Sequence, residues 1–209
     1  MKIAVVCANG KAGRLIVEEA VNRGLDVTAI VRGQNKSAAK KVIVKDIMEI
    51  TKDDVKNFDV VIDAFGTWKI EDLPNHTVTS QHLCDVLSGT DTRLLIIGGA
   101  GSLYTDKTHT LQLFKAPNFP AEYLPTATAQ SNELDELRKR DDVKWTFVSP
   151  AADFQAEGER TGKYILAGEE FTLNSKGESI ISYADFAVAM VDEATKGNHI
   201  QQRISVVRE

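Results

Sequence analysis

The segment between Cys7 and Gly13 has the residue types and spacing that bind a diphosphate. It reads Ala8-Asn9-Gly10-Lys11-Ala12-Gly13, follows an apolar run at residues 3–7 and precedes a helical pattern. Gly10 and Gly13 are spaced like the last two glycines of the G-x-G-x-x-G dinucleotide turn. Gly10 would let the backbone approach a pyrophosphate, and Gly13 would let the helix pack on the strand. Because the first glycine of the motif is absent, an ordinary strand-to-helix turn is the alternative interpretation.

The end of the next apolar run, residues 26–31, bears on the choice between the two pyridine nucleotides. Proteins that choose NAD usually place Asp or Glu there to bind the ribose 2′-OH. This chain has Arg32 there, and Lys11 adds positive charge within the turn. A guanidinium binds a 2′-phosphate through charge and paired hydrogen bonds, so NADP is predicted, with NAD as the other possibility. The alternative is that Arg32 is only a solvated surface charge.

Strand and helix patterns alternate along most of the chain. Further strands are predicted at 42–44, 58–63, 93–97 and 144–148, with helices at 75–88 and 127–140. This alternation predicts an α/β fold of the Rossmann type, with a doubly wound, mostly parallel sheet. Ligands of such sheets lie beyond the carboxyl ends of the strands. Small residues at several of these ends predict a long groove, although glycines also serve simply to make tight turns.

The last third of the chain changes character. Residues 152–181 are expected to form a small C-terminal substrate lobe on a single domain spanning 1–209. Strand-like pieces occur at 163–166 and 170–173, and an alternating strand at 203–207 ends the chain. A helix is predicted to start near Tyr183, with Ser182 as its cap and Asp185 in its first turn; Gly24 is predicted to end the first helix.

Residues 102–125 form a long stretch without clear periodicity. Its aromatic residues suit a flap over a flat ring system, and a partly disordered surface loop is the alternative. Within it, Ser102, Tyr104 and His109 are the candidate substrate-side groups. Packed or solvated side chains are the other interpretation for each of them.

Composition and charge limit the classes of function. The chain has 209 residues, 43% of them hydrophobic, and a formal charge of −5. This charge argues against a nucleic-acid surface, and no apolar run approaches the ~20 residues needed to span a bilayer. Cys7 and Cys84 stand far apart without a C-x-x-C motif, so neither a zinc site nor a disulfide framework is predicted. A cytoplasmic protein is expected, since the first strand leaves no room for a signal peptide; a monomer and a homodimer both stay open.

The pair of residues that moves a hydroxyl proton in short-chain dehydrogenases, Tyr-x-x-x-Lys, is absent. The residues four positions after the four tyrosines are Thr108, Ala127, Gly168 and Ala187. Alcohol dehydrogenation and sugar-nucleotide epimerisation are therefore disfavoured, since both must move a hydroxyl proton. Hydride transfer to a flavin asks less, because stacking of two rings within reach is sufficient.

These features together resemble a known group. The chain is similar to the atypical short-chain dehydrogenases/reductases of the NmrA-like and NAD(P)H-flavin reductase type, the group related to biliverdin reductase B. The resemblance covers nearly the whole chain and is carried by the glycine turn and four further segments: Gly98 to Leu103, Ser149-Pro150-Ala151, Glu159 to Tyr164, and Gly177 to Ala187.

The resemblance implies a function and a set of contacts. It implies an NAD(P)H-dependent oxidoreductase that passes hydride to FMN, FAD or a similar planar acceptor. The alternative is a non-catalytic NmrA-like sensor that binds NADP and a protein partner. By resemblance, Asn9, Gly10, Lys11, Ala12 and Gly13 would hold the pyrophosphate, Arg32 the 2′-phosphate, Asp46 and Ile47 the adenine, Ala64, Phe65 and Gly66 the adenosine side, and Ser149, Pro150 and Ala151 the nicotinamide.

Overall fold

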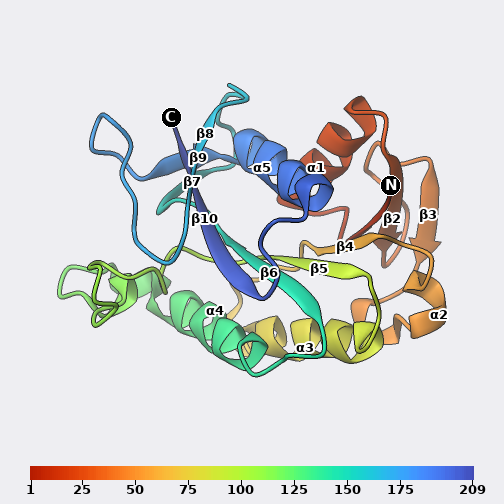
Figure 1. Ribbon diagram of the computed structural model, residues 1–209, viewed down its shortest axis with the longest axis horizontal. Helices are drawn as coiled ribbons and strands as arrows, with labels where there is room; N and C mark the ends of the chain where they lie inside the picture. The colour runs from red at the N-terminus through yellow and green to blue at the C-terminus, as the bar shows by residue number, and fades with distance from the viewer.

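An eight-stranded sheet forms the centre of the computed structural model, which describes residues 1–209 (Figure 1). Its strands are β1 (Lys2–Val6), β2 (Asp26–Val31), β3 (Lys41–Val44), β4 (Val60–Asp63), β5 (Arg93–Ile97), β6 (Lys144–Ser149), β8 (Tyr164–Ala167) and β10 (Gln202–Arg208). The spatial order is β3-β2-β1-β4-β5-β6-β10-β8. All neighbours run parallel except β8, which pairs antiparallel with β10 at the sheet edge. The predicted mostly parallel Rossmann-type sheet is confirmed.

Helices cover both faces of this sheet. Figure 1 shows α1 (Lys11–Asn22) and α5 (Tyr183–Lys196) on one face, with α2 (Lys52–Val55), α3 (Asn75–Leu87) and α4 (Leu124–Leu137) on the other. Side chains alternate along each strand, so Ile3 and Val5 enter the core under α1 and α5, while Ala4 and Val6 enter the opposite core. Burial on both sides explains why the strand reads as a continuous apolar run. No helix has the length and apolarity needed to cross a membrane.

The predicted helix boundaries have the expected chemistry. Gly24 adopts φ +74° just beyond α1, and its N–H donates to the Val21 carbonyl at 2.9 Å. Ser182 begins α5, where its Oγ accepts from the Asp185 N–H at 2.9 Å. Left-handed backbone favours glycine, and a serine cap satisfies a helix N–H that has no partner within the helix.

Three element predictions need correction. The strand-like piece at 170–173 is not a strand, because only Glu170 makes an isolated bridge, to Tyr104. The chain turns away after Tyr104, so no neighbouring strand continues the ladder. The helix predicted at 127–140 lies three residues earlier, because Pro125 fits in its first turn, where no N–H partner is lost. The strand predicted at 163–166 is shifted by one residue, to β8.

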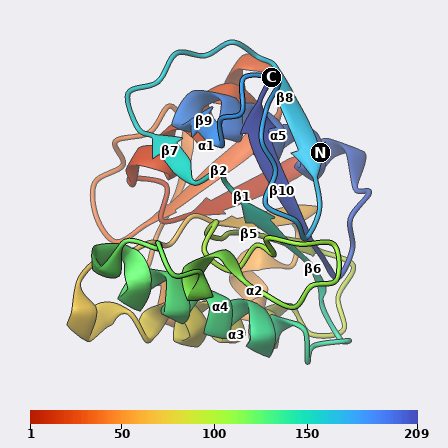
Figure 2. The same cartoon turned by 90° about the vertical axis from the view of Figure 1, so that its left-hand side faces the viewer.

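A second, two-stranded sheet lies outside the main one and was not predicted. Strands β7 (Asp153–Gln155) and β9 (Ile180–Ser182) pair parallel, and Figure 2 shows them on the α1 and α5 side of the main sheet. Three residues are too few for a recognisable alternation. Residues 152–181 therefore supply nearly all of this small sheet, and they also supply β8, the edge strand of the main sheet.

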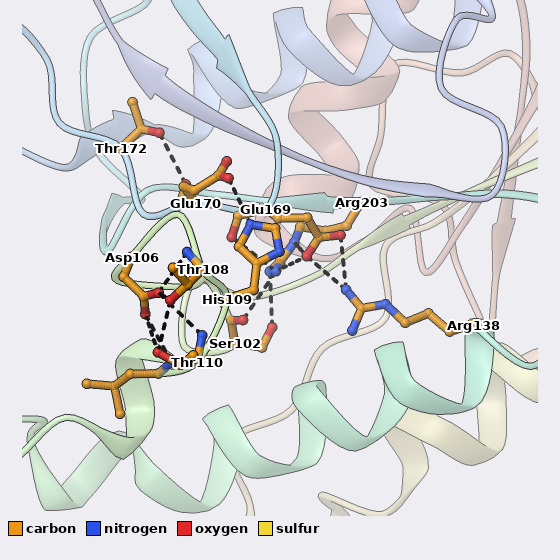
Figure 3. Close-up of polar contacts among 11 residues, drawn as sticks. Ser102, Asp106, Thr108, His109, Thr110, Arg138, Glu169, Glu170, Thr172 and Arg203 are labelled. Atoms are coloured by element: carbon orange, nitrogen blue, oxygen red, sulfur yellow. Dashed lines mark hydrogen bonds and ion pairs between the residues drawn. The ribbon is translucent and has the colours of Figure 1, made fainter.

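The long segment between β5 and α4 is held by polar contacts. Asp106 accepts hydrogen bonds from the N–H groups of Thr108 and Leu111 at 2.9 and 3.1 Å, closing a tight turn (Figure 3). The segment also contains two short 3₁₀ turns, Leu113–Lys115 and Ala121–Tyr123. It therefore follows a defined path from the sheet to the first turn of α4.

Candidate functional site

The glycine turn closes tightly around the carbonyl oxygen of Cys7. The Gly10 N–H donates to that oxygen at 3.0 Å, and Cys7 itself adopts φ +57°. A Cβ on Gly13 would lie 2.8 Å from the same oxygen and 3.1 Å from the Ala8 Cα. Any side chain at position 13 would therefore push α1 away from β1.

The beginning of α1 is suited to an anion. Gly10 occupies the cap position and has no side chain to accept from the first helical N–H groups. The N–H groups at the start of a helix have no partner within the helix, and the helix dipole is positive there. Lys11, Ala12 and Gly13 form this first turn. Backbone donors of this kind bind phosphate.

A cavity of about 500 Å³ opens beside this turn, at the carboxyl ends of β1, β2 and β4. We call it the nucleotide cavity. Its lining includes eight of the positions named from the sequence, which are Asn9, Gly10, Arg32, Asp46, Ile47, Ala64, Phe65 and Gly66. The structure thus brings together residues from four segments of the chain that the sequence analysis assigned to one ligand.

Arg32 is free to meet a ligand at the edge of the nucleotide cavity. Its side chain is 83% exposed, and its Nε lies 4.0 Å from Asp46 Oδ2, a weak surface pair. Asn9 fixes the neighbouring loop, because its Oδ1 accepts from the Lys36 N–H at 2.7 Å and its Nδ2 donates to the Gln34 carbonyl at 2.9 Å. The glycine turn and the segment that carries Arg32 are therefore linked.

A larger cavity of about 590 Å³ lies at the carboxyl ends of β5 and β6. We call it the aromatic cavity, because Trp68, Phe119, Tyr123, Phe154, Phe171 and Tyr183 contribute to its lining. The ring centroids of Phe154 and Tyr183 are 3.9 Å apart, and those of Trp68 and Tyr123 are 6.1 Å apart. A volume of this size is typical of sites for small molecules.

The glycines at the end of β5 are required by packing. A Cβ on Gly98 would lie 2.0 Å from the Phe147 ring, and one on Gly101 would lie 2.5 Å from the Ala127 Cβ. A Cβ on Gly99 would lie 2.1 Å from the Gln130 Oε1. The strand end therefore fits closely between β6 and α4 and forms one wall of the aromatic cavity.

The two cavities adjoin across the sheet. In the strand order β2-β1-β4-β5-β6, the nucleotide cavity lies at the ends of β2, β1 and β4, and the aromatic cavity lies at the ends of β5 and β6. Gly66 lines the first cavity and Trp68 lines the second. An extended ligand lying across the strand ends would reach both.

The candidate substrate-side groups Ser102, Tyr104 and His109 lie outside both cavities. Ser102 is buried, and its Oγ accepts from Arg203 Nη1 at 3.3 Å. Tyr104 and His109 stack with ring centroids 4.5 Å apart. Figure 3 shows His109 beside Glu170, where His109 Nε2 pairs with Glu170 Oε1 at 2.8 Å. None of the three lines either cavity. The structure therefore places these groups in a supporting polar network.

The segment Ser149-Pro150-Ala151 is divided between core and cavity. Pro150 and Ala151 line the aromatic cavity, whereas Ser149 is fully buried and its hydroxyl has no hydrogen-bond partner. The predicted position of this segment beside a nicotinamide agrees with its location at the junction of sheet and aromatic cavity. That role stays a prediction.

Buried titratable groups lie beneath the loop that joins the two cavities. Burial raises the pKa of Asp63 to about 6, raises the pKa of Glu133 well above its ordinary value, and lowers the pKa of His76. His76 Nε2 donates to the Thr67 carbonyl at 3.3 Å, which turns its Nδ1 toward Glu133 Oε2 at 3.8 Å. His76 thus supports the loop between Gly66 and Trp68.

Neither cavity offers an activated tyrosine or thiol. Burial raises the pKa of Tyr183 in the aromatic cavity, so its hydroxyl holds its proton. In the nucleotide cavity, burial raises the pKa of Cys7 to about 12, which leaves a thiol instead of a nucleophilic thiolate. The site is therefore equipped to position flat rings.

A sequence model described as NAD(P)H-binding matches residues 7–196. The chain belongs to this NAD(P)H-binding family. A Streptococcus pneumoniae protein named provisionally as an NADH-flavin reductase is 56% identical, and its crystal structure matches with a TM-score of 0.98 and full coverage of both chains. YwnB of Bacillus subtilis is 44% identical over 212 residues, covering 100% of this chain and 99% of YwnB.

A third relative carries a different name. A Bacteroides thetaiotaomicron protein named provisionally as an epimerase is 33% identical and matches with a TM-score of 0.84, covering 99% of this chain and 96% of its own. The resemblance found in the sequence is thus confirmed for nicotinamide-cofactor binding and for likeness to flavin-reductase-type proteins. Relatives with two different names share the fold, so the fold alone does not fix the reaction.

Several lining residues were absent from the sequence-based site. Trp68, Phe154, Phe171, Tyr183 and Gln130 come from separate segments, and no motif joins them. The only available signal was the position of Trp68, two residues after Gly66 at a predicted strand end. The fold brings the others to one cavity from α4, which carries Gln130, from β7 and α5, which carry Phe154 and Tyr183, and from the loop after β8, which carries Phe171.

Proposed function

We propose that the protein is an NAD(P)H-dependent reductase that passes hydride to a flavin or a similar planar acceptor. The observation that carries this proposal is the adjacency of the nucleotide cavity and the aromatic cavity at the strand ends. One would accommodate the adenosine and diphosphate part of a dinucleotide beside a helix N-terminus, and the other would offer ring faces to the nicotinamide end and to a flat partner. The provisional name of the Streptococcus pneumoniae relative supports the same reaction.

The residues present fit a dinucleotide. The uncapped first turn of α1 would bind the diphosphate, and the position of Gly13 leaves no room for a side chain between helix and strand. Arg32 would pair with a 2′-phosphate, which favours NADP over NAD. When bound, the reduced cofactor supplies two electrons and one proton as a hydride from C4 of its nicotinamide ring.

The chain's own contribution would be positioning. Pro150 and Ala151 would hold the nicotinamide end of the cofactor, while Trp68, Tyr123 and Tyr183 would place the acceptor ring and exclude water. The acceptor takes the hydride, and solvent supplies the second proton, so that one acceptor is reduced for each cofactor oxidised. Holding two rings within reach is the main demand of such a transfer.

The test is a steady-state assay that follows the loss of reduced nicotinamide absorbance. NADPH and NADH are each combined with FMN, FAD, riboflavin and menadione. The expected result is turnover with at least one flavin and a lower KM for NADPH than for NADH. Tight cofactor binding by calorimetry without turnover of any acceptor would contradict the proposal.

A second candidate is a non-catalytic NADP sensor that binds a protein partner. The observation that favours it is the lack of a Tyr-x-x-x-Lys pair, together with Ser102, Tyr104 and His109 lying outside both cavities. A sensor would bind the cofactor and leave every acceptor unreduced. The same assay therefore separates the two functions.

A further inference from the structure

The aromatic cavity has no positively charged side chain in its lining that could bind the phosphate of a phosphate-bearing acceptor. Twelve of its 21 lining residues are hydrophobic, and the carboxylate of Asp153 is its one charged side chain. The lysines nearest in sequence to lining residues, Lys69 and Lys115, do not line it. Lys115 instead places its Nζ 5.3 Å from the centre of the Phe114 ring.

Asp153 is held in place at this cavity. It is the first residue of β7, and its N–H donates to the Ser179 carbonyl at 2.9 Å. The preceding N–H, of Ala152, donates to Ser179 Oγ at 3.1 Å. The Asp153 Oδ2 accepts from Gln155 Nε2 at 2.9 Å. Backbone and side chain are thus both tethered, and the carboxylate is exposed to solvent and to an incoming ligand.

A phosphate monoester carries a charge of about −1.5 to −2 at neutral pH. Bringing it beside a fixed carboxylate is repulsive, and that repulsion acts within a Debye length of about 8–10 Å. An uncharged flat ring meets a mostly apolar and aromatic surface there and has no charge for Asp153 to repel. The expected difference in affinity between charged and uncharged ligands is therefore electrostatic, and it decreases as the salt concentration rises.

We infer that the aromatic cavity selects uncharged planar acceptors, such as riboflavin or a quinone, over phosphate-bearing ones such as FMN, and that Asp153 is the selecting residue. This inference rests on the proposed reductase function and names the acceptor class of the same site. The reaction is unchanged: the acceptor gains a hydride from the reduced cofactor and a proton from solvent. Only the charge carried by the acceptor decides between substrates.

Riboflavin and FMN differ by one phosphate, so they form a matched pair of probes. We expect kcat/KM for riboflavin to exceed that for FMN by about three- to tenfold at low salt, with the difference shrinking in about 0.5 M NaCl. Asp153→Asn should lower this ratio by about threefold, and Asp153→Lys should invert it. Asp91→Asn is the control, because Asp91 is fully exposed at the opposite, amino-terminal end of β5.

Binding is measured alongside turnover by the fluorescence of each flavin. The same order of affinities without turnover would support the inference and contradict the proposed reductase function. Turnover with FMN at least as efficient as with riboflavin would overturn the inference and leave the reductase function standing. A ratio unmoved by Asp153→Lys, or binding of neither flavin, would also overturn it.

Discussion

The nucleotide cavity and the aromatic cavity are built by different means. The first is lined by the glycine turn at Asn9 and Gly10, which comes just before α1, and by the ends of neighbouring strands. The second is formed by side chains from segments as distant as Trp68, Tyr123 and Tyr183. Backbone geometry shapes the diphosphate end of the first cavity, with Arg32 as the side chain predicted to set its cofactor preference, whereas side chains from distant segments shape the second.

This difference implies unequal responses to substitution. A change in the glycine turn alters the position of a helix, and every contact that depends on the helix changes with it. A change in the aromatic cavity removes one ring face and leaves the rest of the wall standing. The following predictions are arranged from the largest expected effect to the smallest.

Gly13→Ala should have the largest effect, because its Cβ would lie 2.8 Å from the Cys7 carbonyl oxygen. We expect the free energy of unfolding to fall by about 1–3 kcal/mol, as for other overpacked sites. Turnover should fall by about 100-fold, since a shift of about 1 Å in a positioning element can have that effect. Chemical denaturation and steady-state kinetics measure the two quantities.

Gly168→Ala is the matched control, because a Cβ there would meet nothing within 4 Å and its backbone is not left-handed. It should leave both stability and turnover near the values of the native protein. Native-like stability and turnover in Gly13→Ala would show that the turn is not the rigid element described above.

Arg32→Asp should separate the two cofactors. Loss of a charge-assisted hydrogen bond of about 1.5–3 kcal/mol corresponds to about a 10- to 100-fold weaker Kd for NADPH. The Kd for NADH, which lacks the 2′-phosphate, should change little. Calorimetry with both nucleotides measures this, and Lys40→Asp, the same charge reversal at an exposed site outside the cavity, is the control. Equal losses for both nucleotides would remove Arg32 from 2′-phosphate recognition.

Trp68→Ala should affect the acceptor and spare the cofactor. Trp68 is 69% exposed and lines the aromatic cavity, so its ring is available for stacking. An aromatic contact of about 0.5–1.5 kcal/mol predicts a KM for the acceptor raised about two- to tenfold. Trp68→Phe should retain most of the native value, and Ile70→Ala, exposed nearby but outside the lining, is the control. An equal loss of NADPH affinity would count against separate cavities.

Glu133→Gln should show the smallest effect, on stability alone. A glutamate in the unfolded chain ionises near pH 4.3, whereas burial holds the pKa of Glu133 well above its ordinary value. Between these two pKa values the folded protein keeps a proton that the unfolded chain releases, so stability falls as pH rises. The amide removes this dependence.

The Tm of Glu133→Gln should therefore exceed that of the native protein at pH 8, and the difference should vanish toward pH 4. Thermal denaturation across this range measures it. Glu136→Gln, on an exposed part of the same helix, is the control and should lack the pH dependence. A pH-independent difference would mean that Glu133 is ionised in the folded protein.

The sequence predicted the nucleotide cavity far better than the aromatic cavity. The glycine turn, Arg32 and the strand ends at Asp46 and Ala64 are local signals, and the parallel order of the strands brings them together. The roles of these residues in binding stay predictions. The aromatic cavity depends on the return of the chain through three-residue strands and on turns held by Asp106, which have no periodicity to recognise. Pro150, Ala151 and the aromatic residues of 102–125 were indicated by the sequence, and the other lining residues could be identified only from the fold.

One buried cation has a consequence for the wall of the aromatic cavity. Arg203, on the last strand, donates to the Ser102 carbonyl at 3.2 Å and to Glu169 Oε2 through its Nε at 2.9 Å (Figure 3). Glu169 also pairs at 2.8 Å with Arg138, the residue just after the end of α4. The segment that follows Ser102 is thus fixed at its base by the carboxy-terminal strand. A chimera that grafts residues 105–122 from a homologue would replace the part of the aromatic cavity lining between Leu113 and Pro120 and leave Asp153 and the nucleotide cavity unchanged. Strand β10 therefore serves the site from a distance, because it anchors a segment that supplies part of the wall.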